Sequence, residues 1–377
     1  MAVAPRVVII GGGIAGCAVA IELLTRGSVV TVVDRERPGR GATGASAGML
    51  TPQYESPGPT PDFRLGVQSR LAWPGFAERL ERLCGTELVH RTDGMLVANR
   101  DAEEEDAAHA TLRYHHEVGL QGEVVTPAEA RKVHPGVARD APSWLWLPDE
   151  GQIDVQRLAD ALGTGVRAAG GDVVTGVAVE RIESAASRVK GVRLTEGTVL
   201  HSDLVVVAAG AWSDQVGGLP RSLPVRPVRG QMVRLRPADP LPWTLVADHG
   251  GHYVVPRMNG TVLVGSTMED IGFDATATVE ARETLFTAGR ALIPDLSGAE
   301  VVEHWCGFRP ISSDGAPILG PDPDIEGLFY ATGAGRRGIL LAPLIGRIVA
   351  DLAITGATSA EWTDFSVTRF DVARPVR

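Results

Sequence analysis

The chain has 377 residues, which is more than a single hydrophobic core usually holds, so we expect two domains. Its net charge of -10 favours a soluble protein and argues against a nucleic-acid-binding surface. The three cysteines, Cys17, Cys84 and Cys306, show no metal-ligand spacing, and so sparse and odd a count is typical of a reducing cytoplasm.

The first predicted elements form a strand, turn, helix and strand. Four apolar residues at 7–10 suit a strand covered on both faces. The pattern G-x-G-x-x-G follows at 11–16, and residues 14–26 predict a helix that ends at Gly27. A second strand at 29–33 leads to Asp34, which can accept hydrogen bonds from a ribose, while the glycines and helix start suit a pyrophosphate. The predicted cofactor-binding residues are Gly11, Gly13, Ile14, Ala15, Gly16, Asp34 and Arg35.

Residues 7–24 are apolar enough to be compared with a signal peptide or a membrane span. The run has no basic region beyond Arg6, no cleavage site, and four glycines within residues 11–16. We therefore expect buried structure here and no membrane association.

A second glycine-rich loop at residues 39–50 indicates which dinucleotide is bound. It carries four glycines with hydroxyl residues between them, directly after the predicted ribose-binding acid. Such a loop can lie against a long cofactor and donate backbone N–H groups to it, which suits FAD rather than NAD. The predicted contacts in this loop are Ala42, Thr43, Ala47, Gly48 and Met49.

These two loops together resemble those of the D-amino-acid-oxidase-like flavoproteins, and most closely of the glycine oxidases of thiamin biosynthesis. The resemblance covers nearly the whole chain. It implies an α/β fold with a discontinuous Rossmann-like FAD-binding domain of glutathione-reductase-like topology and an antiparallel-sheet substrate domain. It assigns residues 1–85, 148–225 and 305–377 to the FAD-binding domain, and residues 86–147 and 226–304 to the substrate domain.

Four later segments carry the same resemblance. An apolar strand at 204–207 ends in a small-residue turn at Gly210, and the strand around Val177 resembles the one that meets the adenine. Asn259-Gly260 predicts a hairpin within the segment 252–268. The other two segments are 304–320 and 333–343. The resemblance implies cofactor contacts in the last segment at Gly333, Ala334, Gly335, Arg336, Arg337, Gly338, Ile339 and Leu340. A helix starting near Gly338 would place its positive end toward the flavin.

The candidate substrate site follows from what flavin oxidation of an amino acid requires. A carboxylate is best held by a planar guanidinium, and the resemblance assigns this role to Arg309 in the sequence Gly307-Phe308-Arg309-Pro310. It also implies that Tyr253 lies near the substrate, that Arg336 adds positive charge, and that Met49 and Met268 line the pocket. We expect oxidation of glycine, with sarcosine and small D-amino acids as further candidates, by non-covalent FAD with O2 as the acceptor.

Two rival functions remain open within this fold. One is a D-amino-acid dehydrogenase that passes electrons to a quinone; the other is a flavoprotein that binds FAD without redox function. The sarcosine oxidases are disfavoured, because residues 310–314 lack a flavin-linking cysteine and residues 264–267 lack an oxygen-activating lysine. We expect no metal and a homo-oligomer, and we interpret His115-His116 as a solvated pair on a helix.

Overall fold

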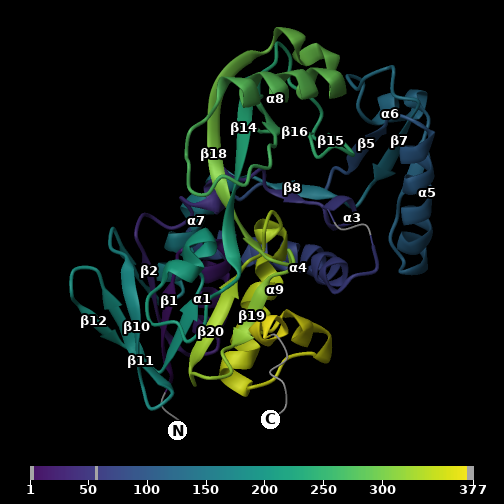
Figure 1. Cartoon of the computed structure of the whole chain (residues 1–377). Coiled ribbons are helices and arrows are strands. Elements are labelled where there is room, and N and C mark those ends of the chain that lie inside the picture. The colour runs from purple at the N-terminus through teal and green to yellow at the C-terminus, as the bar shows by residue number, and fades with distance from the viewer. Residues whose placement is uncertain (1–3, 56–57, 372–377) are drawn as a thin grey trace.

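A six-stranded sheet forms the centre of one half of the molecule in the computed structural model, which describes residues 4–55 and 58–371 (Figure 1). Five strands are parallel, and the edge strand β19 is antiparallel to its neighbour β20. In spatial order the strands are β19 (Ile318–Pro321), β20 (Leu328–Thr332), β13 (Leu204–Val207), β1 (Arg6–Ile10), β2 (Val29–Asp34) and β9 (Asp172–Thr175).

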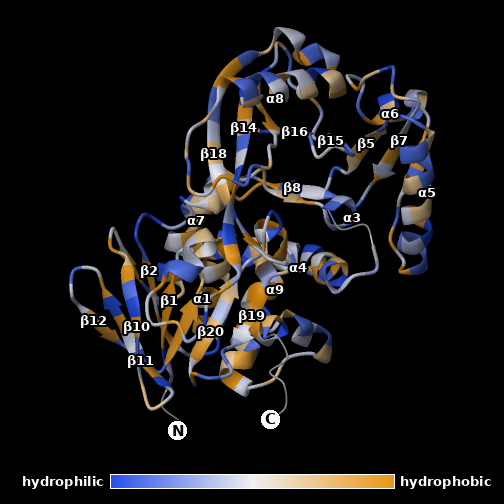
Figure 2. Ribbon diagram, in the orientation of Figure 1, coloured by the Kyte–Doolittle hydropathy of each residue, from blue (hydrophilic) through white to orange (hydrophobic). Residues whose placement is uncertain are grey.

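Side chains alternate between the two faces of this sheet and are buried on both. Val7 and Ile9 of β1 pack with a helical layer, whereas Val8 and Ile10 pack against a three-stranded antiparallel sheet. Burial on both faces explains why β1 reads as an uninterrupted apolar run, which Figure 2 shows in orange. The helical layer consists of α1 (Ile14–Thr25), α4 (Pro61–Cys84), α7 (Val155–Ala168) and α9 (Gly338–Thr355). The small sheet consists of β10 (Val179–Ala185), β11 (Arg188–Leu194) and β12 (Val199–His201).

The N-terminal strand, turn and helix are confirmed. The strand β1 and helix α1 occupy the predicted positions, and Gly27 has a φ of +86°, a conformation in which glycine is favoured. The run at 7–24 is therefore part of the folded core. Within the described ranges, α9 alone has the length and apolarity of a membrane span, but 61% of it is buried inside the protein, as expected for a core helix.

An eight-stranded sheet forms the other half of the molecule. All its neighbouring strands are antiparallel except β15 and β5. In spatial order the strands are β18 (Glu300–Ser312), β14 (Val225–Arg236), β17 (Val262–Gly265), β16 (Tyr253–Pro256), β15 (Leu245–Asp248), β5 (Met95–Asn99), β7 (Ser143–Leu147) and β6 (Glu123–Val125). The predicted hairpin joins β16 to β17 through Gly260, whose φ is +74°.

The two faces of this sheet have different neighbours. One face packs under α6 (Pro127–Val133) and α8 (Val279–Leu292). The other packs against α5 (Ala102–Glu117), against Ala47 and Met49 of the second glycine-rich loop, and against Tyr54, which follows that loop. This second face carries Tyr253 and Met232 and therefore looks toward the nucleotide-binding half.

The long strands β14 and β18 join the two halves. They pair along almost their whole length, from Val225 with Ser312 to Arg236 with Glu300, and Figure 1 shows them running from one half into the other. The predicted boundary between residues 304 and 305 lies within β18, and the domain limits stay a prediction. The remaining short elements near the junction are α2 (Ala42–Ala45), α3 (Pro52–Glu55), β3 (Met49–Leu50), β4 (His90–Arg91) and β8 (Gly151–Ile153).

Candidate active site

A cavity of about 350 Å³ lies between the two halves, at the carboxyl ends of the parallel strands. Gly11 follows β1, Asp34 ends β2, Ala208 follows β13 and Thr332 ends β20, and all four residues line the cavity. Parallel α/β sheets bind their ligands at this edge because the connecting loops diverge there and leave a crevice.

The three glycines of the G-x-G-x-x-G pattern have different physical roles. A Cβ atom on Gly11 would lie 2.4 Å from the carbonyl oxygen of Ala208, and one on Gly16 would lie 2.0 Å from that of Gly11. These two glycines allow the turn and α1 to pack against the strands. A Cβ on Gly13 would meet no protein atom closer than Thr43 Oγ1 at 3.5 Å, and Gly13 lines the cavity. Gly13 therefore keeps space open for a ligand.

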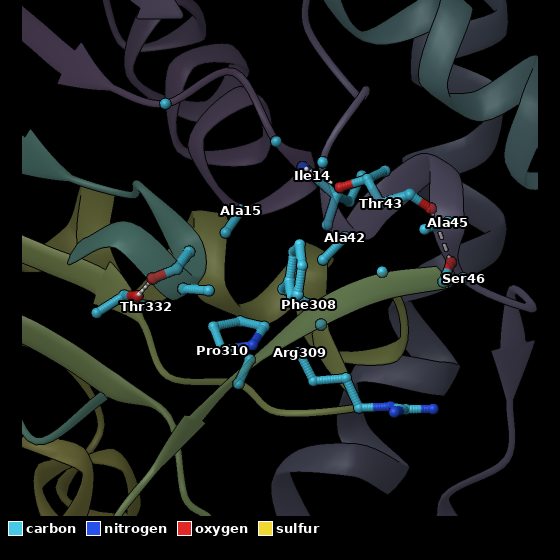
Figure 3. Close-up of a pocket in the computed structure, with 18 of the residues that line it drawn as sticks. Ile14, Ala15, Ala42, Thr43, Ala45, Ser46, Phe308, Arg309, Pro310 and Thr332 are labelled. Atoms are coloured by element: carbon cyan, nitrogen blue, oxygen red, sulfur yellow. Dashed lines mark hydrogen bonds between the residues drawn. The ribbon is translucent and has the colours of Figure 1, made fainter. Parts of the chain in front are cut away.

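The start of α1 and the second glycine-rich loop lie at one end of the cavity (Figure 3). The backbone N–H of Ile14 donates to Thr43 Oγ1 at 3.0 Å, which fixes the loop to the helix start. Ala15 and Ala42 line the cavity beside them. The positive end of a helix dipole favours an anionic group such as a pyrophosphate at this position.

Asp34 lies where the ribose of a dinucleotide is bound in such a fold. Its Oδ2 accepts from the N–H of Gly12 at 2.7 Å, and its Oδ1 accepts from that of Glu36 at 2.8 Å. The carboxylate thus also holds the glycine turn. Burial raises the pKa of Asp34, and the two backbone hydrogen bonds oppose that shift. Arg35, the next residue, lines the cavity and stacks over Trp212 at 3.7 Å from the ring centre.

The second glycine-rich loop is held by the substrate-side sheet through its carbonyl groups. Trp305 Nε1 donates to the carbonyl of Ala45 at 3.1 Å, and the Arg257 guanidinium donates to that of Ala47. The N–H groups of Ala47 and Gly48 have no hydrogen-bond partner within the described chain, and both residues line the cavity. The loop therefore offers backbone donors to a ligand, as its sequence predicted.

The start of α9 closes the other end of the cavity. The cavity is lined there by Gly333, Ala334, Gly335, Gly338 and Ile339. A Cβ on Gly338 would meet nothing closer than Ala334 at 3.9 Å, so the glycine leaves room for close approach of a ligand. Gly210, three residues after β13, lines the same cavity with a φ of +56° and open space around its Cβ position.

These residues fit FAD. The open positions at Gly13, Gly210 and Gly338 provide space, and two helix starts and the unpaired N–H groups provide donors for phosphates and a flavin ring. Bound FAD would supply the electron acceptor for oxidation of a substrate C–H bond. No group of three His, Cys, Asp or Glu side chains that could hold a metal occurs in residues 4–55 and 58–371.

Arg309 lines the cavity from β18 (Figure 3). Its Nη1 donates to the carbonyl of Thr267 at 3.0 Å and its Nη2 donates to Ser266 Oγ at 2.6 Å. Both acceptors are neutral, and no carboxylate in the described ranges lies within 4.0 Å of the guanidinium. Burial lowers the pKa of Arg309, while the nearby Tyr253 opposes that shift. A cation in this setting is suited to an anionic ligand.

The guanidinium reaches this position because β14 carries a glycine beside it. A Cβ on Gly230 would lie 1.9 Å from Arg309 Nη1 and 2.3 Å from Cζ. The Arg309 side chain therefore crosses β14 over Gly230. The sequence did not single out Gly230, because the relation is made by the pairing of β14 with β18.

Tyr253 lies on the same wall of the cavity and is 7% exposed. Its hydroxyl donates to Met232 Sδ at 3.9 Å. The ring packs over Gly265, where a Cβ would lie 2.5 Å from the hydroxyl. Met49 also lines the cavity. The structure thus brings Arg309, Tyr253 and Met49 together.

Glu55 is a cavity residue that the sequence did not indicate. Its side chain is 4% exposed, and its Oε2 lies 4.0 Å from Arg336 Nε. Burial raises the pKa of the Glu55 carboxyl, and the charges of Arg336, Arg337 and Arg309 oppose that shift. The adjacent Tyr54 lines the cavity as well, and its hydroxyl donates to the carbonyl of Asp248 at 2.8 Å.

Several predicted site residues lie outside the cavity. Met268 is 56% exposed: its neighbours Thr267 and Glu269 pair with β14, and the side chain between them points the other way. Val177 lies between β9 and β10, and Ala178 and Val179 line the cavity in its place. Arg337 pairs with Asp62 at 3.0 Å in a neighbouring hollow. The other two residues, Gly16 and Leu340, are buried in the packing of α1 and α9.

The interpretation of His115-His116 as a solvated pair is wrong for His115. His116 is exposed, but His115 is fully buried. Its ring stacks on Phe63 with ring centres 5.2 Å apart, and its Nδ1 lies 3.3 Å from Gln53 Nε2. The helix α5 carries it toward α3 and α4, a contact between segments far apart in the sequence.

Comparison with known proteins identifies the family. Residues 6–352 match the family model described as FAD dependent oxidoreductase (DAO), so the chain belongs to this family. It is 34% identical to a glycine oxidase of Geobacillus kaustophilus over 96% of both chains, and 34% identical to a glycine oxidase of Pseudomonas aeruginosa over 92% of this chain and 94% of that one.

A solved structure supports the same relationship. The crystal structure of glycine oxidase from Geobacillus kaustophilus superposes with a TM-score of 0.92, covering 97% of this chain and 99% of that one at 34% identity. The predicted α/β fold with an FAD-binding half is therefore confirmed, and FAD is the cofactor of the family to which the chain belongs.

Proposed function

We propose that the chain is an FAD-dependent glycine oxidase that converts glycine, O2 and water to glyoxylate, ammonia and H2O2. The observation that carries the proposal is the Arg309 guanidinium, which faces the cofactor cavity with only neutral protein acceptors. The small amino acids are the substrate class, because their carboxylate would satisfy this cation.

The side chains around Arg309 suit the binding and orientation of such a substrate. Arg309 would hold the carboxylate at two points, and Tyr253 would limit the space beside it. The amine must be neutral before its carbon can lose a hydride, so the substrate has to lose a proton in the site. Glu55, a carboxyl group whose pKa is raised by burial, lines the same cavity and is the candidate acceptor for that proton.

The names of relatives support a role in thiamin biosynthesis. The chain is 33% identical over 97% of its length to a Bifunctional protein ThiO/ThiG of Trichormus variabilis, of which it covers 55%. In this proposal the imine of glycine supplies thiazole formation. The proposal extends to a homo-oligomer and to the cytoplasm. The three free cysteines support the reducing compartment.

The test is to purify the protein, record its absorbance spectrum and measure peroxide with glycine, sarcosine and D-alanine. We expect a flavin spectrum, free FAD in the supernatant after acid precipitation, and peroxide formation with glycine. Substrate-dependent reduction of a quinone analogue without peroxide would instead identify a dehydrogenase. A flavin spectrum that no amino acid bleaches under anaerobic conditions would contradict both.

A further inference from the structure

A polar cluster lies on the side of β14 opposite to Gly230. It consists of Arg229 and Gln231 on β14, with Thr267 and Glu269 on the segment 266–278 that leads from β17 to α8. Arg229 is 4% exposed and Gln231 is fully buried. Alternate residues of a strand face opposite sides, so these two side chains point away from the side chain that crosses Gly230.

Glu269 is the centre of this cluster. Arg229 donates to Oε2 from Nε at 3.0 Å and also from Nη2, and Gln231 Nε2 donates to Oε1 at 2.8 Å. The Thr267 hydroxyl donates to Oε1 as well. Burial alone would raise the pKa of Glu269, but these hydrogen bonds outweigh it and hold the pKa below its usual range. The carboxylate is thus charged at neutral pH, and its hydrogen bonds are of the strong, charge-assisted kind.

The same residues fix the backbone of the segment. Arg229 and Glu269 exchange two backbone hydrogen bonds of 2.9 Å, and the N–H of Gln231 donates to Thr267 Oγ1 at 2.9 Å. Arg229 Nη1 donates to the carbonyl of Thr276 at 2.7 Å, farther along the segment. Residues 267–269 are therefore tied to β14 from both their backbone and their side chains.

The other side of this segment holds Arg309. The carbonyl of Thr267 and the hydroxyl of Ser266 accept from its two terminal nitrogens. We propose that Arg229, Gln231 and Glu269 are positioning residues, which hold these two acceptors in place and thereby orient the Arg309 guanidinium toward the substrate carboxylate. The inference rests on the proposed role of Arg309 in substrate binding.

The physical reason is preorganisation. An arginine side chain has several rotatable bonds, and a carboxylate binds at two points only when the guanidinium plane is correctly set. Acceptors fixed before the substrate arrives reduce the entropy that is lost on binding. Loosening them should weaken carboxylate binding even though Arg309 and its charge remain.

The test compares Glu269→Gln with Glu303→Gln in the FAD-bound protein. Glu269→Gln keeps the size of the side chain but removes its charge and places an amide donor among the donors of Arg229, Gln231 and Thr267. Glu303 is the matched control, because it pairs at 3.1 Å with Arg234, another β14 arginine, and forms no hydrogen bond or ion pair with the segment 266–278. The readout is the dissociation constant of acetate, a carboxylate without an amine, titrated by the flavin absorbance.

We expect Glu269→Gln to raise this dissociation constant, and the KM for glycine, by about 5- to 20-fold. Glu303→Gln should change both by less than about twofold. The rate with ethylamine, which has no carboxylate, should be unchanged in both variants. Unaltered acetate binding in Glu269→Gln, or equal weakening in both variants, would overturn the inference.

A second pair of variants keeps the test valid if Glu269→Gln does not fold. Thr267→Val keeps the backbone carbonyl and the shape of the side chain but loses the hydroxyl that bonds Glu269 and Gln231. Thr267→Ser restores that hydroxyl. We expect Thr267→Val to weaken acetate binding and Thr267→Ser to retain it. Equal binding by the two variants would contradict the positioning role.

Arg309→Lys, titrated in parallel, separates this inference from the proposed function. If Arg309→Lys binds acetate as the parent does, the carboxylate role of Arg309 fails and the positioning role fails with it. If Arg309→Lys loses acetate while Glu269→Gln and Thr267→Val retain it, the positioning role alone is wrong.

Discussion

Replacement of Gly230 by alanine should disable carboxylate binding without altering any charged residue. The three atoms nearest to the added Cβ are all in the Arg309 guanidinium, at 1.9 to 2.4 Å. Gly230 does not have a positive φ, so alanine can adopt its backbone conformation. The strain therefore falls on the Arg309 side chain rather than on β14.

The size of the effect follows from the distance that the guanidinium must move. Ordinary contact with the new methyl group requires a retreat of about 1.5 Å by Nη1. Such a shift breaks the hydrogen bonds to Thr267 and Ser266, which are 3.0 and 2.6 Å long. A misplacement of roughly 1 Å in a substrate-positioning group can lower kcat/KM about 100-fold. We expect a loss of that order for glycine.

The assay is peroxide formation over a range of glycine concentrations, with FAD content measured on the same samples. Gly75→Ala is the control, because Gly75 is exposed on α4 and its added Cβ would meet nothing within 4 Å. The rate with ethylamine should be nearly unaffected by Gly230→Ala. A kcat/KM for glycine within about threefold of the parent would refute the idea that Arg309 must cross Gly230 to bind substrate.

Four further predictions concern the cofactor, the substrate cation and pH. Gly13→Val should abolish FAD retention, measured by flavin absorbance after gel filtration, because its side chain would enter the cavity; a variant that stays yellow would contradict this. Asp34→Ala should weaken FAD binding, measured by reconstitution, yet leave kcat at saturating FAD nearly unchanged; normal FAD affinity would disprove a ribose role. Arg309→Lys should lower kcat/KM for glycine by about 2–4 kcal/mol, roughly 30- to 1000-fold, with normal FAD content, because one nitrogen cannot make the planar two-point contact; a near-parental rate would make Arg309 structural. Burial raises the pKa of Glu150 to about 8. Between the ordinary carboxyl pKa and about 8, the folded protein therefore binds more protons than the unfolded chain. The contribution of Glu150 to stability is thus lost as pH rises through that window. Glu150→Gln should therefore show a smaller fall in Tm from pH 5 to pH 8 than the parent, and an equal fall would show that Glu150 does not titrate there.

The nucleotide-binding half of the site was predictable from local sequence patterns. The strand β1, the glycine turn, α1 and Asp34 form one continuous stretch, and their positions depend on local rules of burial and backbone conformation. The hairpin at Gly260 and the start of α9 were predictable for the same reason. Gly11 and Gly16 are needed because a Cβ atom there would collide with nearby backbone, and the sequence pattern alone shows this need.

The substrate side of the site depends on contacts between segments that are far apart in the sequence. Gly230 accommodates Arg309 only because β14 pairs with β18, and Glu55 enters the cavity only because α3 follows the second glycine-rich loop across the junction. Met268 looked like a pocket residue but is exposed, and His115 looked solvated but is buried. Each of these outcomes depends on which distant segment packs against the residue. The period of a strand or helix determines the face on which a side chain lies, but it does not determine which other segment covers that face.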